Sequence, residues 1–171
     1  MNLSYQFTDY DSGHYEQAFA LRYRVFYKKL QLPVESVIDD KEAAAFHGVA
    51  VDMDIDRVVG CVRLSLDDDT AQISAMVVDE DYRVKGIGSE LLQMAINKAR
   101  DLGISKIFLH GRLTAIEFYK RHGFVEVGGI YPSKLTGVLH VRTWIHLIME
   151  AEDEQAYSGG NFATSTGFVF I

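Results

Sequence analysis

The segment from Met76 to Ser89, MVVDEDYRVKGIGS, limits the folds open to this 171-residue chain more than any other segment. It joins an apolar, strand-like run directly to a turn that contains Gly86 and Gly88, and a helical pattern follows. The first N–H groups of a helix have no partner within the helix, so they can bind an anion. Glycines let such a group approach the backbone and tolerate positive φ. The segment therefore predicts a phosphate-binding turn between a strand and a helix.

Two glycine-bearing patterns carry this prediction. Arg83, Gly86 and Gly88 form RxxGxG, and Arg83 and Lys85 add positive charge that suits a diphosphate. Taken alone, RxxGxG is equally well explained as a tight strand-to-helix turn. A second pattern, AxxFYxxxGF, lies downstream and predicts a helix that stops at a glycine and leads into a strand. Its members are Ala115, Phe118, Tyr119, Gly123 and Phe124.

Together, the two patterns resemble the GNAT family of acyl-CoA-dependent N-acetyltransferases. RxxGxG matches the pyrophosphate loop of that family, and AxxFY matches its tyrosine-bearing helix. The resemblance covers about residues 21–149 and is strongest over 73–124, while LRYRVF is similar to a bacterial branch with an LRxxVF opening. It implies a single-domain α/β (α+β) fold with a central mixed, mainly antiparallel, strongly twisted sheet flanked by helices.

Composition and charge fit one soluble globular domain, with 48% hydrophobic and 24% charged residues. The net charge of −7 argues against a nucleic-acid partner and is compatible with a cationic amine substrate. Cys61 is the only cysteine, and its apolar neighbours indicate a packing position in a strand. No apolar run approaches the ~20 residues of a membrane span and no signal-peptide pattern is visible, so we expect no membrane partner and a cytoplasmic location.

Hydrophobic periodicity predicts the order of the elements. Strands are expected over residues 3–8, 48–53, 57–66, 71–78, 105–110, 124–130 and 138–149. Helices are expected through Lys28, from Ile87 to a stop at Gly103, and after Thr114, which with Glu117 has capping-box spacing. A loop with a helical turn near 41–45 follows the first helix. The acidic turns between strands are interpreted as solvated hairpin tips, and no metal is expected.

The resemblance implies that acetyl-CoA is the co-substrate and that it lies along the loop and the preceding strand. The implied cofactor-binding residues are Met76, Val78, Arg83, Val84, Lys85, Gly86, Ile87, Gly88, Ser89 and Arg112. In the family, a main-chain N–H of that strand, here at Met76 or Val78, donates to the thioester carbonyl. Many family members have an asparagine where this chain has Arg112, which could instead meet a phosphate or an acidic substrate.

Catalysis in the family needs a general acid for the departing thiolate and a base for the attacking amine. Tyr119 occupies the position of the acid, and a phenol with an ordinary pKa near ~10 suits that role. The amine is expected to attack directly, without a covalent enzyme intermediate. The candidate bases are His47, His110, His140, Glu35 and Glu126. Tyr119 and His140 are taken as the catalytic residues, because His140 resembles a histidine common in the bacterial branch.

Two other functions compete with small-acyl transfer to a primary amine of a small molecule or peptide. LRYRVF and the segments IDDKEAAAFHGVAV and VVGCVRL are also similar to acyl-homoserine-lactone synthases and related long-chain N-acyl synthases. Those synthases generally lack the RxxGxG and AxxFY patterns together, which favours acetyl transfer. A non-catalytic acyl-CoA-binding sensor belongs to another class, and the presence of Tyr119 favours an enzyme.

The C-terminal extension, residues 150–171, lies outside the resemblance and follows an acyltransferase domain over 1–149. AEDEQAYSGG is typical of a linker, whereas FATSTGFVFI ends in an apolar run. A frayed tail is one interpretation. The other is that residues 161–171 dock on the domain or on a second subunit of a homodimer, because an apolar terminus is costly to leave in water.

Overall fold

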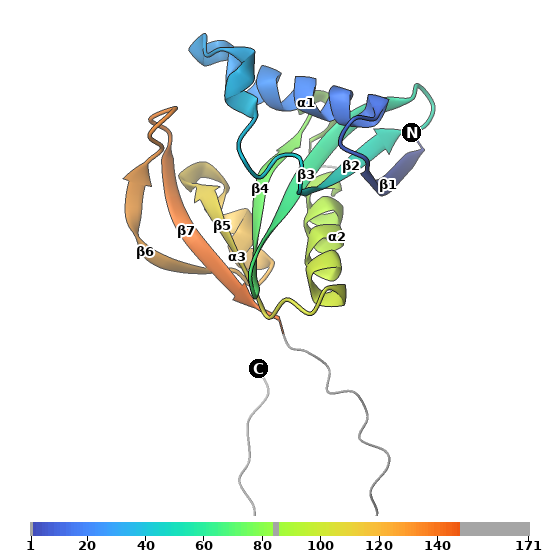
Figure 1. Cartoon of the computed structure of the whole chain (residues 1–171). Helices are drawn as coiled ribbons and strands as arrows, with labels where there is room; N and C mark the ends of the chain where they lie inside the picture. The colour runs from blue at the N-terminus through green and yellow to red at the C-terminus, as the bar shows by residue number, and fades with distance from the viewer. Residues whose placement is uncertain (1, 84–85, 148–171) are drawn as a thin grey trace, which may run out of the picture.

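A computed structural model describes residues 2–83 and 86–147, built around a seven-stranded sheet in the order β1-β2-β3-β4-β5-β7-β6 (Figure 1). The strands are β1 (Leu3–Thr8), β2 (Phe46–Asp52), β3 (Arg57–Asp67), β4 (Thr70–Val78), β5 (Lys106–Arg112), β6 (Val125–Pro132) and β7 (Leu139–His146). The helices are α1 (Gly13–Phe26), α2 (Ile87–Asp101) and α3 (Ile116–Arg121), with 3₁₀ turns η1 (Lys28–Leu30), η2 (Val34–Val37), η3 (Glu80–Tyr82) and η4 (Leu113–Ala115). Among the described strands, only β4 and β5 pair in parallel. The predicted mixed, mainly antiparallel α/β fold is confirmed.

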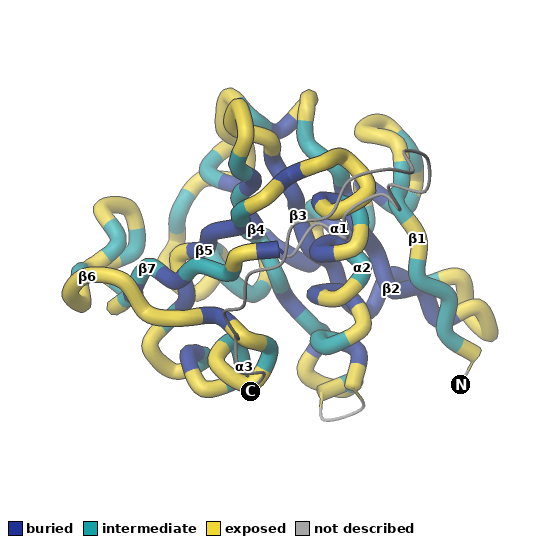
Figure 2. The backbone as a smooth tube through the Cα atoms, turned by 90° about the horizontal axis from the view of Figure 1, so that it is seen from below, coloured by how far each residue is buried: buried dark blue, intermediate teal, exposed yellow. Residues whose placement is uncertain are grey.

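Helices cover both faces of the sheet, with α1 on one face and α2 and α3 on the other (Figure 1). Successive residues of a strand point to opposite faces, so the sheet contributes side chains to two hydrophobic clusters, one on each face. Leu21 of α1 packs with one cluster, and Leu91 of α2 packs with the other. Figure 2 shows that the central strands are buried, whereas the edge strand β6 is largely exposed. Cys61 is buried within the α1 cluster, and burial raises the pKa of its thiol to about 12, as expected for a packing residue.

Helix α2 follows its predicted course because its apolar stripe is continuous. Its buried members are Ile87, Leu91, Leu92, Ala95, Ile96 and Ala99, whereas Leu102, predicted to continue the stripe, is the C-cap and is exposed. Gly86 is the N-cap of the helix, with φ 78°, and Gly103 follows its end with φ 74°. Gly60 of β3 allows the helix to lie close to the sheet, since an added Cβ would lie 2.9 Å from Leu91 Cδ1.

The sheet divides between β4 and β5. The two strands pair only from Thr70 opposite Lys106 to Ile73 opposite Leu109. Beyond Ile73 the pairing of β4 with β3 shifts register, and Ala75 takes a φ of 51°. An extra residue in one strand bends it, so this bulge turns β4 away from β5. A gap therefore opens between the C-terminal ends of the two strands, as the diverging ribbons of Figure 1 show.

Several local predictions were wrong. The first helix ends at Phe26, because Tyr27 leaves the helical region with φ −123°. Thr114 does not cap the third helix: it lies within η4, and the N-cap position is Ala115, which makes no side-chain capping bond. In the loop after α1, the 3₁₀ helix is η2, while residues 40–44 form hydrogen-bonded turns close to the predicted turn at 41–45.

Some predictions concern residues outside the described ranges. These are the loop residues Val84 and Lys85 and the extension over 150–171. Among the described residues, no helix is long and apolar enough to cross a membrane. Within the same ranges, no group of three or more His, Cys, Asp or Glu side chains could hold a metal ion.

Candidate active site

A cavity of about 290 Å³ occupies the gap between the ends of β4 and β5. Its walls come from the C-terminal part of α1, from η2 and the residues that follow it, from the start of α3, and from the connection between β6 and β7. Because the gap divides the sheet, the cavity is bounded by residues from both faces. Phe26 of α1 contributes from one face, and Tyr119 of α3 contributes from the other.

The glycine turn lies at the N-terminus of α2. Gly86 is exposed, and its φ of 78° is one that residues with a Cβ rarely adopt. Gly88 is half-buried, and an added Cβ would lie 3.5 Å from Met76 Cε. Ile87 is 1% exposed, so its side chain belongs to the core and only its backbone can serve a ligand. Arg83 and Gly86 are both exposed, so the described part of the turn is accessible to an anion.

Asp79 anchors the approach to this turn and was not anticipated from the sequence. Its Oδ2 accepts hydrogen bonds from Arg24 Nη2 and Arg57 Nη2, each over 2.6 Å. Burial raises the pKa of Asp79, but the Arg24 guanidinium and the Asp81 N–H outweigh it, so the carboxyl pKa lies below its usual value. The ion pairs join α1 and β3 to the end of β4, which fixes where the turn begins.

Tyr119 places its hydroxyl at the gap. Its Oη lies 3.8 Å from Met76 Sδ on β4, a weak acceptor. Gly111 of β5 allows the ring to lie close, since an added Cβ would be 3.3 Å from Tyr119 Cδ2. Burial raises the pKa of Tyr119 to about 12, although the nearby Arg112 opposes the rise. The phenol is therefore protonated at neutral pH and can donate a proton.

The backbone of β4 supplies hydrogen-bond donors on the side of the gap. Beyond Ile73, β4 has no ladder partner from β5 within the described residues. N–H groups of an extended strand point alternately to its two sides, so some of those between Ser74 and Val78 face the gap. Met76 and Val78 both lie in this stretch, and Met76 also lines the cavity. Such a donor can stabilise oxyanion charge on a thioester.

Two histidines and a tyrosine form a cluster on the β5–β7–β6 side of the cavity. His110 Nδ1 is hydrogen-bonded to Tyr131 Oη, and the Tyr131 ring stacks on His140 with centroids 6.3 Å apart. His140 Nδ1 lies 2.7 Å from Val138 O. Because a carbonyl can only accept, Nδ1 of His140 carries a proton, and in the neutral ring Nε2 is free to act as a base. Burial, with Arg142 and His140, lowers the pKa of His110.

A buried ionic network forms the wall beside η2. Glu42 is 1% exposed and accepts hydrogen bonds from Arg22, Arg63 and Tyr15. Burial raises the pKa of Glu42, but Arg22 and the other donors lower it to about 2. Arg63 also donates to both carboxylate oxygens of Asp39, over 2.8 and 2.7 Å. The network ties the segment after η2 to α1 and β3, and so positions that wall.

The structure brings some predicted site residues together and leaves others apart. Met76, Arg112, Tyr119 and His140 all line the cavity, and His110 joins them. The remaining candidate bases lie elsewhere. His47 is buried against the Glu42 carbonyl, Glu126 pairs with Lys120 on α3, and exposed Glu35 does not line the cavity. Val78, Arg83 and residues 86–89, the described part of the predicted donor site outside Met76 and Arg112, lie outside the cavity lining.

Comparison with known proteins identifies the family. Residues 10–124 match the model of the acetyltransferase (GNAT) family. The chain is 30% identical to YjcF of Bacillus subtilis, named as an uncharacterized N-acetyltransferase, over 64% of this chain and 76% of YjcF.

Solved structures agree in fold. A Lactobacillus plantarum protein superposes with a TM-score of 0.75 at 24% identity, over 86% of this chain and 100% of that one. A GNAT acetyltransferase from Elizabethkingia anophelis with acetyl-CoA bound gives 0.64 at 17% identity, over 85% and 99%. The chain therefore belongs to the acetyltransferase (GNAT) family and is an N-acetyltransferase.

Proposed function

We propose that the protein transfers an acetyl group from acetyl-CoA to a primary amine within the gap between β4 and β5. One observation carries the proposal: the protonated Tyr119 hydroxyl lies beside Met76, where β4 leaves its partner strand and exposes backbone donors. Gly88, in the turn where the diphosphate would bind, lies beside Met76. Acetyl-CoA bound to the Elizabethkingia anophelis neighbour supports the choice of donor.

The donor would lie along the turn and β4. The diphosphate would accept N–H bonds from the first turn of α2, from Gly86 to Ser89, with Arg83 and the undescribed Val84 and Lys85 completing the loop. The thioester carbonyl would accept from a β4 N–H at Met76 or Val78. Arg112, at the end of β5, lines the cavity together with Met76.

The transfer would proceed by direct attack. The amine nitrogen bonds to the thioester carbon, the carbon–sulfur bond breaks, and Tyr119 protonates the departing thiolate. The attacking nitrogen gives its proton to Nε2 of His140, directly or through water, because Nδ1 of that ring is bound to Val138 O. A cavity of about 290 Å³ favours a short acyl group over the long chain of a homoserine-lactone-type synthase.

Acetyl-CoA binding and turnover test the proposal separately. Calorimetry should detect binding of acetyl-CoA. When a panel of primary amines is assayed, the enzyme should release free CoA in proportion to the acetylated product. Binding without release across small amines and peptides would favour the acyl-CoA sensor. Release with long-chain acyl-CoA alone would favour the N-acyl synthase.

We also propose that residues 161–171 of one copy pack on the sheet edge of another, giving a homodimer. Strand β6 is an edge strand of the described sheet, and its apolar side chains Val125, Val127 and Ile130 are exposed. An exposed strand edge with apolar side chains can accept a further strand.

A further inference from the structure

One face of the β5–β7 half of the sheet is strongly basic. Ile107 and Leu109 of β5 pack in the α2 cluster, so the alternate residues of β5 point to the opposite face, toward α1. Directly paired residues of neighbouring strands share a face. The registers of β5 and β7 pair His110 with Arg142 and Arg112 with His140. The basic residues on this face are Lys106, His110, Arg112, His140, Arg142 and His146.

No carboxylate balances this face within the described strands. Strands β5 and β7, KIFLHGR and LHVRTWIH, contain no acidic residue. Glu126 of β6 pairs with Thr143 and reaches Lys120 of α3, which places it on the other face. The whole chain carries a net charge of −7, so this basic face opposes the overall charge. Such a local excess favours an anionic ligand.

Within the cavity, the excess charge belongs to Arg112. The guanidinium of Arg22 is paired with Glu42, and that of Arg63 with Asp39 and Glu42. None of the salt bridges found among the described residues involves Arg112. Burial lowers the pKa of Arg112, and only Tyr27 and Tyr119 oppose that shift. The cavity wall therefore contains two neutralised arginines and one that lacks a carboxylate.

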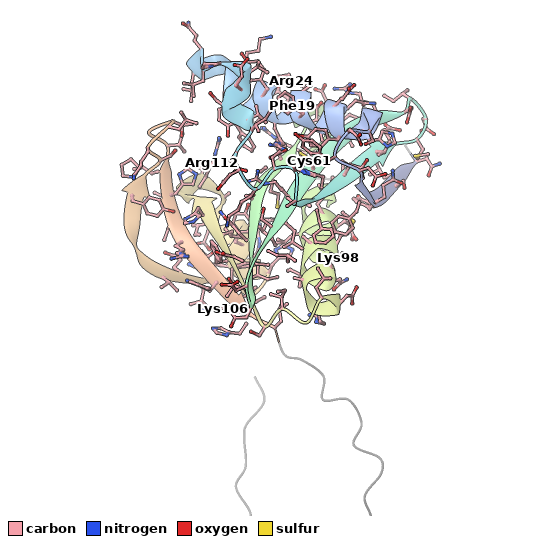
Figure 3. The ribbon with its side chains drawn as sticks, in the orientation of Figure 1. Phe19, Arg24, Cys61, Lys98, Lys106 and Arg112 are labelled. Carbon is pink, nitrogen blue, oxygen red and sulfur yellow. The ribbon has the colours of Figure 1, made fainter. Side chains whose placement is uncertain are left out.

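The orientation of Arg112 leaves its hydrogen-bond donors available. Its guanidinium carbon lies 4.6 Å from the ring centroid of Phe26, across the gap from β5 to α1. Figure 3 shows this side chain at the end of β5, between the two halves of the sheet. Contact with a ring occupies a face of the guanidinium, whereas its N–H groups point outward in its plane. Those N–H groups match the two oxygens of a carboxylate or phosphate.

We propose that Arg112 binds an anionic group of the acceptor, so that the acceptor is a small amine carrying a carboxylate or phosphate close to the amino group. The inference rests on the proposed acetyl transfer. Arg112 and His140 are direct cross-strand partners, which places their Cβ atoms roughly 5 Å apart. An anion held by Arg112 therefore leaves a neighbouring amine within reach of His140 and of the Tyr119 side of the gap.

Pairs of acceptors that differ only in an anionic group test the proposed acceptor class. Free CoA release is measured for the L-amino acids against their carboxamides, and for O-phosphoethanolamine against ethanolamine. Each pair is assayed with the wild type, Arg112→Gln, Arg112→Lys and Arg100→Gln. Arg100 is an exposed residue of α2 that bonds Asn97, so its replacement matches the charge change away from the cavity. Calorimetry with acetyl-CoA is run on every variant.

The expected loss of activity is confined to anionic acceptors. The wild type prefers one anionic series over its neutral counterpart, and Arg112→Gln lowers kcat/KM for that series about 10- to 100-fold, as loss of a charge-assisted hydrogen bond implies. Neutral acceptors and acetyl-CoA affinity stay unchanged, Arg112→Lys recovers part of the loss, and Arg100→Gln matches the wild type. The preferred series distinguishes carboxylate from phosphate.

Four results would overturn the inference. Equal use of anionic and neutral acceptors by the wild type is one, and an equal loss for both in Arg112→Gln is another. Weaker acetyl-CoA binding in Arg112→Gln would instead assign the residue to the donor. Acetyl-CoA binding with no turnover of any pair also rejects this acceptor class, whereas absence of acetyl-CoA binding by the wild type rejects the proposed function itself.

Discussion

Arg22 and Glu42 form a salt bridge in the interior of the domain, with Arg22 Nη1 2.6 Å from Glu42 Oε1 and the two side chains 4% and 1% exposed. Arg22 Nη2 also donates to Val37 O, so the same guanidinium holds both ends of the segment that walls the cavity. Removing one partner of a buried pair leaves the other charge uncompensated, which is costly. The pair therefore holds in place the cavity wall formed by the segment after η2.

Glu42→Gln should lower the free energy of unfolding by about 3–5 kcal/mol, the usual cost of breaking a buried ion pair. The pKa of Glu42 is lowered from 4.5 to about 2, so its stabilisation is complete above the unfolded value and is lost as pH falls toward the folded one. Urea unfolding between those two pH values should show a shallower acid decline in Glu42→Gln. Glu16→Gln, an exposed change in the first turn of α1, is the control. If the stability of the wild type, Glu42→Gln and Glu16→Gln falls equally with decreasing pH, Glu42 is not the source of the acid sensitivity.

The sequence predicted elements whose signals are local. The stripe of α2 has a clear helical period, and the strands alternate or are β-branched, so their order and type follow from short windows. The RxxGxG pattern likewise places a turn before α2. Local signals can also mislead. Thr114 and Glu117 have the spacing of a capping box, yet Thr114 lies inside the 3₁₀ turn η4 and does not cap α3.

The remaining features depend on contacts between distant segments. Arg22 and Glu42 are 20 residues apart, and both belong to residue types that are usually exposed, so their pairing in the core does not follow from the local sequence. The positive φ of Ala75 follows from how β4 fits against β3. His110 and His140 approach each other only through the register of β5 and β7, which the sequence does not specify.

Gly86→Ala should weaken acetyl-CoA binding beyond any effect on stability. Both Gly86 and Gly103 have positive φ, 78° and 74°, and neither has an atom within 4 Å of an added Cβ. Alanine in that conformation costs roughly 1–2 kcal/mol at either site. Gly103→Ala is therefore a matched control, expected to lower Tm similarly while keeping acetyl-CoA affinity. If calorimetry gives the same affinity loss for both variants, the turn at Gly86 does not bind the donor.

Arg142→Gln should raise the pKa of His110. Burial is the main reason that this pKa lies below 6.5, and the positive charge of Arg142 is the next. Removing that charge favours the imidazolium, so the His110 ring should titrate at higher pH in an NMR series. Arg121→Gln, an exposed change on α3, should leave the titration in place. An unchanged His110 titration in Arg142→Gln would show that the charge of Arg142 does not contribute to the lowered pKa of His110.

Deleting residues 161–171 should lower Tm or convert a dimer to a monomer while sparing acetyl-CoA binding. The described cavity and turn both lie before residue 148, so the deletion leaves them intact. Light scattering and thermal unfolding of the full and shortened chains measure the effect. Identical mass and Tm would mean that the segment has no docking role.

Tyr119→Phe should lower kcat by about 100- to 10,000-fold, the range typical of general acid catalysis, with little change in acetyl-CoA affinity. The substitution keeps the ring that packs against Gly111 and Phe124 and removes only the hydroxyl beside Met76 Sδ. Because burial raises the pKa of Tyr119 to about 12, the wild type should show no alkaline loss of kcat from this group across ordinary assay pH.

Tyr10→Phe, a change at an exposed tyrosine before α1, controls for loss of a hydroxyl as such. The two variants should have the same Tm, since neither hydroxyl makes a strong hydrogen bond among the described contacts. A Tyr119→Phe protein with wild-type kcat would mean that the thiolate takes its proton from solvent. In that case the ring at position 119 serves packing alone, and the proton donor in the gap has to be sought among the waters that reach the cavity.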